Sequence, residues 1–326
     1  MTRMILYVLI TLIITTCTKK DATLTAQNLS GKTWGEKLGF PEDMRIIILH
    51  ADDIGMCYEA NEAAKLYLSA DKIQSASMMV PCPLFDAFAE WYKDNPNEDV
   101  GLHLTLTSEW KTYRWAPVAE AHNVPGLIDP EGYMWSDVIN VVQNATPQEV
   151  EVEVRAQIEK ALSKEIKPGH MDTHMGTLYG SLEFAKVYLN LAMEYEIPAM
   201  VIDFTEPIVE RFRGEGYPIT DEMIQFALDY RLPKLDDFHS VSGAGSYQEK
   251  KQKFFDLVRS LKPGITEIIF HPSIESDSLK SITNSWQQRV WESEMFTDPE
   301  VIQFFKDEKV LFTNWKVMME RFRERT

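Results

Sequence analysis

The chain has 326 residues, of which 44% are hydrophobic and 25% are charged, and its formal net charge is −17. This composition is typical of a folded globular protein and argues against a disordered chain. The negative charge argues against nucleic acid as a partner, since nucleic acid requires a basic surface, and against docking on anionic lipid. A neutral or cationic substrate fits this charge better.

The first 17 residues are predicted to be an export signal. Arg3 precedes the apolar run 4–14, which is followed by two threonines and Cys17. This order is typical of a signal peptide that ends at a lipobox cysteine, and the apolar run is too short for a conventional membrane-spanning helix. We therefore expect Cys17 to be the lipidated N-terminus of an exported bacterial lipoprotein, held on the periplasmic or cell-surface side of the envelope. The lipid would be its only contact with the membrane, and an ordinary secretory signal is the alternative.

The remainder is predicted to be a tether and one domain. Residues 18–40 are largely polar and are expected to form a flexible tether, and residues 41–326 are expected to form a single domain. That domain contains two cysteines, Cys57 and Cys82. Export permits a disulfide between them, and two buried free thiols are the alternative.

From residue 45 onward, strand-like and helix-like segments alternate. Apolar runs predict strands at 45–51, 74–80, 100–107, 170–174, 199–204, 266–270 and 310–313. Helical spacing of apolar residues predicts helices at 58–70, 85–92, 147–164, 182–195, 247–261 and 316–323. Such repeated units, with strands apolar on both faces, predict parallel strands covered by helices. We predict an α/β fold in the form of a (β/α) barrel, either a regular TIM-type barrel or a distorted or incomplete one. A doubly wound open sheet is the alternative, but no Gly-x-Gly-x-x-Gly fingerprint follows any strand.

Two adjacent acids, Asp52 and Asp53, follow the first apolar strand. Taken alone, such a pair is more often a turn or a helix cap. However, histidines stand at the ends of three later strand-like runs: His103, His174 and His271. Because the carboxyl ends of parallel strands meet at one end of a barrel, we expect these five side chains to converge.

One carboxylate and two imidazoles form a ligand set that leaves coordination positions open for water and substrate. Asp53, His103 and His174 are the predicted ligands of one divalent metal ion. Zinc and magnesium are the favoured ions, and manganese, cobalt and nickel are alternatives. Among the other histidines, His170 is predicted to be structural, and no role is assigned to His50, His122 and His239.

Three further side chains have predicted tasks beside the metal. Asp52 is the predicted general base, and His271 is predicted to protonate a leaving group or to polarise an oxyanion. Asp172 lies two residues before His174 and is predicted to hold a metal ligand in orientation. Water bound to such a metal becomes acidic enough to act as a nucleophile near neutral pH, so the set as a whole predicts metal-assisted hydrolysis.

Several segments resemble the signature blocks of the YdjC-like carbohydrate deacetylases, also called the ChbG-type family. The blocks occur in order at 49–55, 75–80, 101–107, 170–174 and 270–273. The run 286–289 with Glu292 is similar to a further block, and the resemblance covers roughly residues 44–316. It implies a (β/α)-barrel-like fold and the divalent-metal-dependent removal of acetyl groups from N-acetylated sugars such as chitooligosaccharides.

Carried over residue by residue, the resemblance assigns metal binding to Asp53, His103 and His174, the base to Asp52 and the late histidine to His271. The chain departs from the pattern at two places. His50 and Ala51 stand where the family often has Asn-Ala, and Met175-Gly176-Thr177 follows His174 where the family commonly continues with histidines. Both departures leave the metal set intact and leave the substrate open.

We therefore expect a metal-dependent hydrolase that removes acetyl groups from N-acetylated or O-acetylated carbohydrates. Trp110, Trp115 and Arg289 are the predicted substrate-binding residues, the two indoles as platforms for sugar rings. One alternative is a metal-independent glycoside hydrolase that uses two carboxylates, with Asp172 or Asp203 as the second acid. A non-catalytic sugar-binding lipoprotein is the other alternative.

Overall fold

The computed structural model describes residues 31–214 and 219–325, and these residues contain one sheet of parallel strands. The strands are β1 (Arg45–Ile54), β2 (Ser75–Met78), β3 (Val100–Leu104), β4 (Met171–Thr173), β5 (Asp237–Ser240), β6 (Gly264–Phe270) and β7 (Leu311–Phe312). Their order is β4-β3-β2-β1-β6-β5. The long strand β1 pairs with β7 near its beginning and with β2 near its end. The predicted α/β fold is confirmed.

The two outer strands of this order are joined by isolated bridges, so the sheet curls towards a closed ring. Met171 of β4 pairs in parallel with Ala199, and Ile202 pairs in parallel with Leu235, two residues before β5. The backbone N–H groups of Met171 and Leu235 each donate across these bridges over 2.8 Å. The predicted strand 199–204 is thus reduced to two bridges. The result is a distorted barrel, and the doubly wound alternative is wrong.

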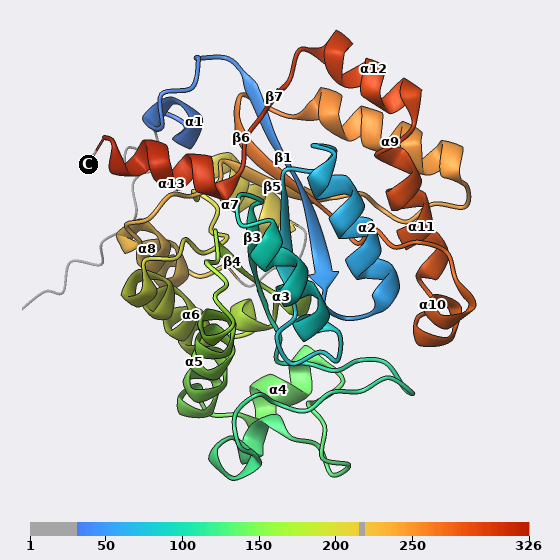
Figure 1. Ribbon diagram of the computed structural model, residues 1–326. Helices are drawn as coiled ribbons and strands as arrows, with labels where there is room; N and C mark the ends of the chain where they lie inside the picture. The colour runs from blue at the N-terminus through green and yellow to red at the C-terminus, as the bar shows by residue number, and fades with distance from the viewer. Residues whose placement is uncertain (1–30, 215–218, 326) are drawn as a thin grey trace, which may run out of the picture.

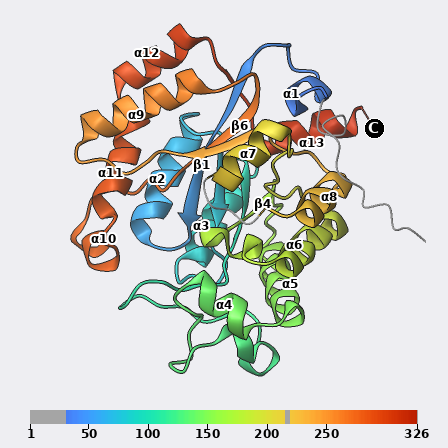
Figure 2. The same ribbon diagram turned by 180° about the vertical axis from the view of Figure 1, so that it is seen from behind.

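Helices surround the sheet in both views (Figures 1 and 2). They are α1 (Trp34–Lys37), α2 (Tyr58–Ser69), α3 (Phe85–Asp94), α4 (Val138–Asn144), α5 (Pro147–Ser163), α6 (Leu182–Tyr195), α7 (Glu206–Gly214), α8 (Asp221–Asp229), α9 (Tyr247–Ser260), α10 (Asp277–Ile282), α11 (Trp286–Met295), α12 (Pro299–Glu308) and α13 (Trp315–Arg323). In the described part of the chain, no helix has the length and apolar character needed to cross a membrane.

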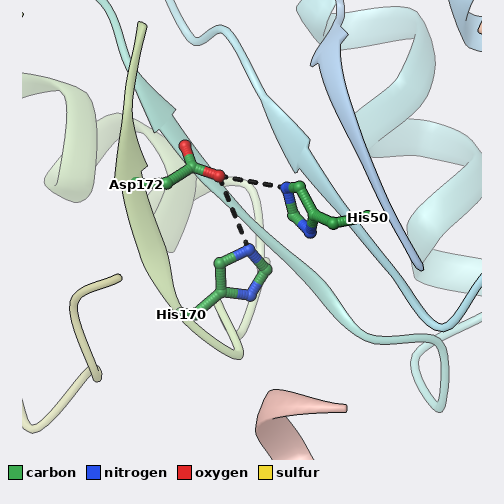
Figure 3. A group of neighbouring side chains, drawn as sticks. All are labelled: His50, His170 and Asp172. Atoms are coloured by element: carbon green, nitrogen blue, oxygen red, sulfur yellow. Dashed lines mark ion pairs between the residues drawn. The ribbon is translucent and has the colours of Figure 1, made fainter. Parts of the chain in front are cut away.

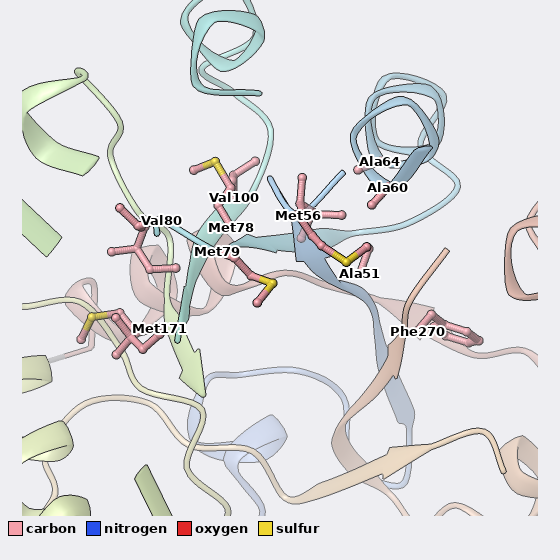
Figure 4. Close-up of a cluster of buried hydrophobic side chains, with 14 of the residues drawn as sticks. Ala51, Met56, Ala60, Ala64, Met78, Met79, Val80, Val100, Met171 and Phe270 are labelled. Atoms are coloured by element: carbon pink, nitrogen blue, oxygen red, sulfur yellow. The ribbon is translucent and has the colours of Figure 1, made fainter. Parts of the chain in front are cut away.

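The outer face of the barrel carries the main hydrophobic core. Residues of β1 alternate between the two faces, and Ile47, Leu49 and Ala51 belong to the core between strands and helices. Figure 4 shows Ala60 and Ala64 of α2 in this core. All five side chains are at most 2% exposed, and alanines on the helix permit a close approach to the strands.

The inner face of the barrel begins with an apolar plug. Ile46 and Ile48 of β1 point inward and pack in a second, separate cluster with Ile265, Leu235, Trp315, Met318 and Leu38. Further along the strands the inward positions become polar, starting with His50 on β1 and Glu267 on β6. The interior therefore changes from apolar to polar towards the end at which the strands terminate. Figure 1 shows α4 below the arrowhead of β1 at that end, and α1 and α13 at the opposite one.

The predicted start of the domain at residue 41 is too late. Residues 34–37 form α1, which begins with a capping box between Thr33 and Glu36. Leu38 is 1% exposed because it packs in the apolar plug, so the end of the predicted tether 18–40 belongs to the domain. The predicted signal peptide with Cys17, and tether residues 18–30, lie outside the described residues. Cys57 and Cys82 are buried free thiols, which is the second of the two expected alternatives.

Candidate metal centre

A bulge in β1 aims both acids of the pair into the barrel. The pairing of β1 with β2 shifts register between Ala51 and Ile54, and Asp53 has a left-handed φ of 65°. In a regular strand, adjacent residues would point to opposite faces, and a bulge with one left-handed residue corrects this. As a result, both carboxylates lie near the ring of His103. Its Nδ1 is 3.9 Å from Asp52 Oδ1, and its Nε2 is 3.4 Å from Asp53 Oδ1.

The three predicted metal ligands come together at the ends of β1, β3 and β4. One donor atom from each of Asp53, His103 and His174 lies within 4.8 Å of the other two. His174 Nδ1 is 3.2 Å from Asp53 Oδ1 and 3.2 Å from His103 Nε2. All three residues are at most 5% exposed. The carboxylate and the two imidazoles thus share one small space.

Each of these side chains has a second partner that fixes its orientation. Arg289 Nη2 of α11 donates to Asp53 Oδ2 over 2.6 Å. His103 Nδ1 lies 2.5 Å from Asp172 Oδ1, and His174 Nε2 lies 3.1 Å from Glu109 Oε2. Carboxylates in these positions orient ligand imidazoles and select the nitrogen that faces a metal. The contact of Asp172 with His103 is the one expected of an orienting group, and its role stays a prediction.

The donor set fits a divalent cation. Asp53 Oδ1 is buried without a well-aligned hydrogen-bond partner, although it faces two imidazole nitrogens. Burial opposes ionisation of Asp53, but the guanidinium of Arg289 outweighs this effect and holds the pKa of the carboxyl well below its ordinary value. Burial lowers the pKa of His174, but the charge of Glu109 and the contact with Asp53 outweigh it and raise that pKa to about 9. The space between the three side chains therefore favours positive charge. A bound metal ion would supply this charge and would displace protons from the ligands.

The predicted proton-transfer residues lie beside this set. Asp52 Oδ1 is 3.0 Å from His50 Nε2, and Asp52 Oδ2 is 3.9 Å from His271 Nε2. The side chain of His271 is 34% exposed, whereas that of Asp52 is 7% exposed. Asp52 is thus enclosed next to the donor set, and His271 lies at its solvent side. This placement is compatible with the predicted base and acid, and both roles stay predictions.

The predicted substrate-binding residues differ in their access to solvent. Trp115 is 3% exposed, its Nε1 donates to the carbonyl of Thr107, and its ring meets His174 at 6.5 Å. A ring enclosed in this way packs against the ligand His174 and cannot stack on a sugar. Trp110 is only partly buried and lies between Trp115 and the guanidinium of Arg289, with centroid distances of 5.3 and 5.8 Å. Of the two predicted platforms, Trp110 is thus the one with part of its surface exposed, and its role stays a prediction.

Several residues of the site were absent from the predicted set. Glu109 contacts His174, and Ser77 Oγ lies 3.1 Å from His50 Nε2. Glu292 Oε2 accepts from the backbone N–H of His271 over 2.7 Å. His50 was assigned no role, yet it is fully buried between Asp52 and Asp172, with 3.0 Å to each. Period-two alternation along 45–51 places His50 and Asp52 on the same face, and that signal could have included His50.

Comparison with known proteins gives a consistent family. The model of the family described as YdjC-like protein matches residues 46–307. A carbohydrate deacetylase of Thermus thermophilus is 28% identical over 266 residues, which cover 82% of this chain and 91% of that protein. A carbohydrate deacetylase of Thermoanaerobacter pseudethanolicus is 24% identical over 275 residues, which cover 84% of this chain and 100% of that protein.

A solved structure has a similar fold. A crystal structure from Enterococcus faecalis V583, described as that of a candidate cellobiose-phosphate cleavage protein, superposes with a TM-score of 0.69. It shares 23% sequence identity and covers 85% of this chain and 99% of that one. At this identity the likeness concerns the fold alone.

Proposed function

Because the chain belongs to the YdjC-like protein family, we propose that it is a divalent-metal-dependent deacetylase of N-acetylated or O-acetylated carbohydrates. The observation that carries the proposal is the convergence of Asp53, His103 and His174, with an unpartnered carboxylate oxygen facing two imidazoles. The two relatives named carbohydrate deacetylase support the substrate class. Zinc or magnesium is the ion we favour, with manganese, cobalt or nickel as alternatives.

The residues of this chain have separate tasks in the proposed hydrolysis. Asp53, His103 and His174 would hold a divalent ion, which would supply Lewis acidity to the acetyl group and lower the pKa of water. Asp52 takes the proton of the attacking water, because it is an enclosed carboxylate directly beside the ligand Asp53. His271 gives a proton to the departing amine nitrogen, or to the departing alkoxide of an O-acetyl ester. The contact of its backbone N–H with Glu292 holds this histidine at the opening.

The substrate would enter beside Trp110 and Arg289. Trp110 offers an apolar face for a sugar ring next to the donor set. Arg289 uses Nη2 for Asp53, while its Nη1 is buried without a hydrogen-bond partner. That nitrogen is a donor for an oxygen of the bound sugar. Arg289 thus both holds the metal carboxylate and contributes to binding.

The site of action is proposed from the N-terminal sequence. We propose that the chain is exported and lipidated at Cys17, and that it acts on the periplasmic or cell-surface side of a bacterial envelope. Labelling with radioactive palmitate in a bacterial host should mark the wild-type chain and not the Cys17→Ser variant. Equal labelling of both chains would contradict this location.

The proposed activity is tested by measuring acetate release and bound metal together. The purified chain is given acetylated chitooligosaccharides, and metal is determined by mass spectrometry in the wild type and in the variants Asp53→Ala and His174→Ala. We expect both variants to lose acetate release and the ion at this site together, and EDTA to abolish activity of the wild type. His122→Ala is the matched control, because His122 is 74% exposed and contacts only Glu120 among the ion pairs of the described residues.

Two outcomes would contradict the proposal. Full acetate release by His174→Ala protein that holds no metal would exclude the metal-dependent mechanism. Release of shortened sugars with their acetyl groups intact, in the presence of EDTA, would favour the glycoside hydrolase instead.

A further inference from the structure

A second group with the same donor types lies deeper in the barrel. Figure 3 shows His50 of β1, His170 just before β4, and Asp172 of β4 pointing toward one another. Asp172 Oδ2 is 3.0 Å from His50 Nε2 and 3.8 Å from His170 Nε2. The three residues are 0%, 0% and 4% exposed, so this group is enclosed on all sides. We call it the inner cluster.

The inner cluster contains buried polar atoms that lack partners. Both ring nitrogens of His170, Nδ1 of His50 and Oδ2 of Asp172 have no aligned hydrogen bond. Buried polar atoms in native proteins nearly always have one. His170 Nε2 and Asp172 Oδ2 face each other, so these two unsatisfied atoms indicate a bound group between them, whereas the two Nδ1 atoms lie on the far sides of their rings. Gly101 of β3 keeps this arrangement possible, because a Cβ there would lie 2.4 Å from Cε1 of His170. The absence of a side chain at Gly101 therefore leaves space for the imidazole of His170.

Negative charge surrounds the inner cluster. The carboxylates of Asp52, Asp172 and Glu267 face the barrel interior and are at most 6% exposed. Within the described residues, the cation that contacts the acid pair is Arg289, which is bound to Asp53. Buried charge without compensation is costly, and a cation held between the two histidines and Asp172 would balance it.

The distances are compatible with a bound cation. Four donors around zinc at 2.0–2.1 Å in tetrahedral geometry lie about 3.4 Å from one another. The two distances from Asp172 Oδ2, 3.0 Å and 3.8 Å, lie on either side of this value. Asp172 Oδ2 is also the acceptor that both histidines face. We propose that His50, His170 and Asp172 bind a second divalent transition-metal ion, with zinc the best match to the donor set, and that this ion has a structural role.

The two sites would share one carboxylate. Asp172 Oδ1 contacts His103, a ligand of the candidate metal centre, and Asp172 Oδ2 belongs to the inner cluster. An ion at the inner cluster would therefore fix the carboxylate that orients His103. The inner ion itself needs no deacetylase activity, so its existence does not depend on the proposed function.

Metal stoichiometry tests this proposal. The untagged chain is loaded with zinc, freed from excess ion by gel filtration, and analysed by mass spectrometry for zinc per chain. We expect about two ions in the wild type, one in His170→Gln, one in His174→Gln and none in the double variant. Thermal unfolding of each loaded variant checks its fold, and loading with Co²⁺ gives a visible absorption band for each occupied tetrahedral site, which identifies the ion that each variant has lost.

The outcomes separate this proposal from the proposed function. One ion in the wild type that His170→Gln retains would overturn the inner site and leave the deacetylase proposal standing. Two ions in the wild type, with no loss in His174→Gln and loss of one in His170→Gln, would support the inner site and contradict the candidate metal centre. If His170→Gln fails to fold, His50→Gln provides the same test, because it removes a different ligand and keeps a side chain of similar reach.

Discussion

The candidate metal centre and the inner cluster use the same donor types but differ in access. Each combines one aspartate with two histidines. The first is bordered by side chains that reach solvent, with Glu109 22% and His271 34% exposed. The second is closed by Trp315, which stacks on His170 at 5.5 Å and belongs to the apolar plug. Catalytic metal sites keep one coordination position open for water or substrate, and structural sites do not. Because the donors are alike, access to solvent is what distinguishes a catalytic role for the first cluster from a structural role for the second.

Asp52 and Asp172 connect the two clusters. Asp52 faces His50 with one oxygen and His271 with the other, at 3.0 and 3.9 Å. Asp172 likewise contacts His103 on one side and His50 on the other. Substitutions at these two positions therefore test whether one cluster is catalytic and the other structural.

The largest expected effect is that of Asp52→Asn on turnover. Removing a general base typically costs 10²–10⁴ in rate, so we expect kcat for acetate release to fall by about 10³. Bound metal should not change, because Asp52 belongs to neither proposed ligand set. Stopped acetate assays and mass spectrometry of metal measure the two quantities, and Asp277→Asn on the fully exposed side chain of α10 is the control. A variant that loses metal along with activity would show that Asp52 helps to hold an ion, either directly or through His50.

Much of this arrangement could be predicted from sequence because barrel strands are buried on both faces. Such strands are continuous apolar runs, and the polar residue that ends each run stands at the rim of the barrel. This reasoning found Asp53, His103 and His174 on three strands. It could not find the bulge that turns Asp52 and Asp53 to the same side, since strand periodicity places neighbours on opposite faces.

The remaining gaps have local physical causes. β5 was missed because its sequence, Asp-Phe-His-Ser at 237–240, has no apolar run, its first three residues are only partly buried and Ser240 is exposed. Helix α1 was assigned to a tether because four residues show no periodicity, whereas its stability comes from tertiary contacts: Asp236 accepts from the backbone N–H groups of Trp34 and Gly35. Glu109 was missed because it lies in an irregular segment, where neither strand nor helix period places a side chain.

The second prediction concerns residues 118–119, which belong to the same irregular stretch of chain as Glu109 and Trp110. Glu153 of α5 is fully buried and accepts from the backbone N–H groups of Val118 and Ala119 at 2.9 and 2.8 Å. Burial raises its pKa from 4.5 to about 7, against the opposing effect of these hydrogen bonds. Because the folded pKa is the higher one, this contribution to stability is complete below pH 4.5 and is lost as the pH rises through 7.

Glu153→Gln removes this titration. The wild-type free energy of unfolding, relative to that of the variant, should fall by roughly 3 kcal/mol between pH 4 and pH 8. Urea unfolding of both proteins at several pH values measures this difference. Glu151→Gln, on the same helix with a side chain 49% exposed, should follow the wild type. A constant difference between wild type and Glu153→Gln would mean that Glu153 ionises normally, and that the segment 118–119 is not held by a neutral carboxyl.

The third prediction is that Asp172→Asn affects both clusters. Groups that orient metal ligands typically contribute 10- to 100-fold to affinity or activity, and we expect the upper end because Asp172 contacts both His103 and His50. kcat/KM should fall on the order of 100-fold, and zinc per chain should fall from two to one. Unchanged zinc with reduced activity would restrict Asp172 to orienting His103, and the two clusters would then be less alike than their donors indicate.

The smallest expected effect is that of Glu109→Gln, which touches the candidate metal centre alone. Glu109 Oε2 lies 3.1 Å from His174 Nε2, but its side chain is partly exposed, so water can replace part of the contact. We expect kcat/KM to fall about 10-fold, at the lower end for a residue that orients a metal ligand, with the affinity of the first ion reduced in parallel. Titration with zinc and acetate assays measure both, and Glu131→Gln is the control because its side chain is 74% exposed. Since Glu109 makes no contact with His50, His170 or Asp172 among the interactions of the described residues, the second ion should bind as in the wild type. Weaker binding of both ions would mean that the two clusters are coupled through His174 as well as through Asp172.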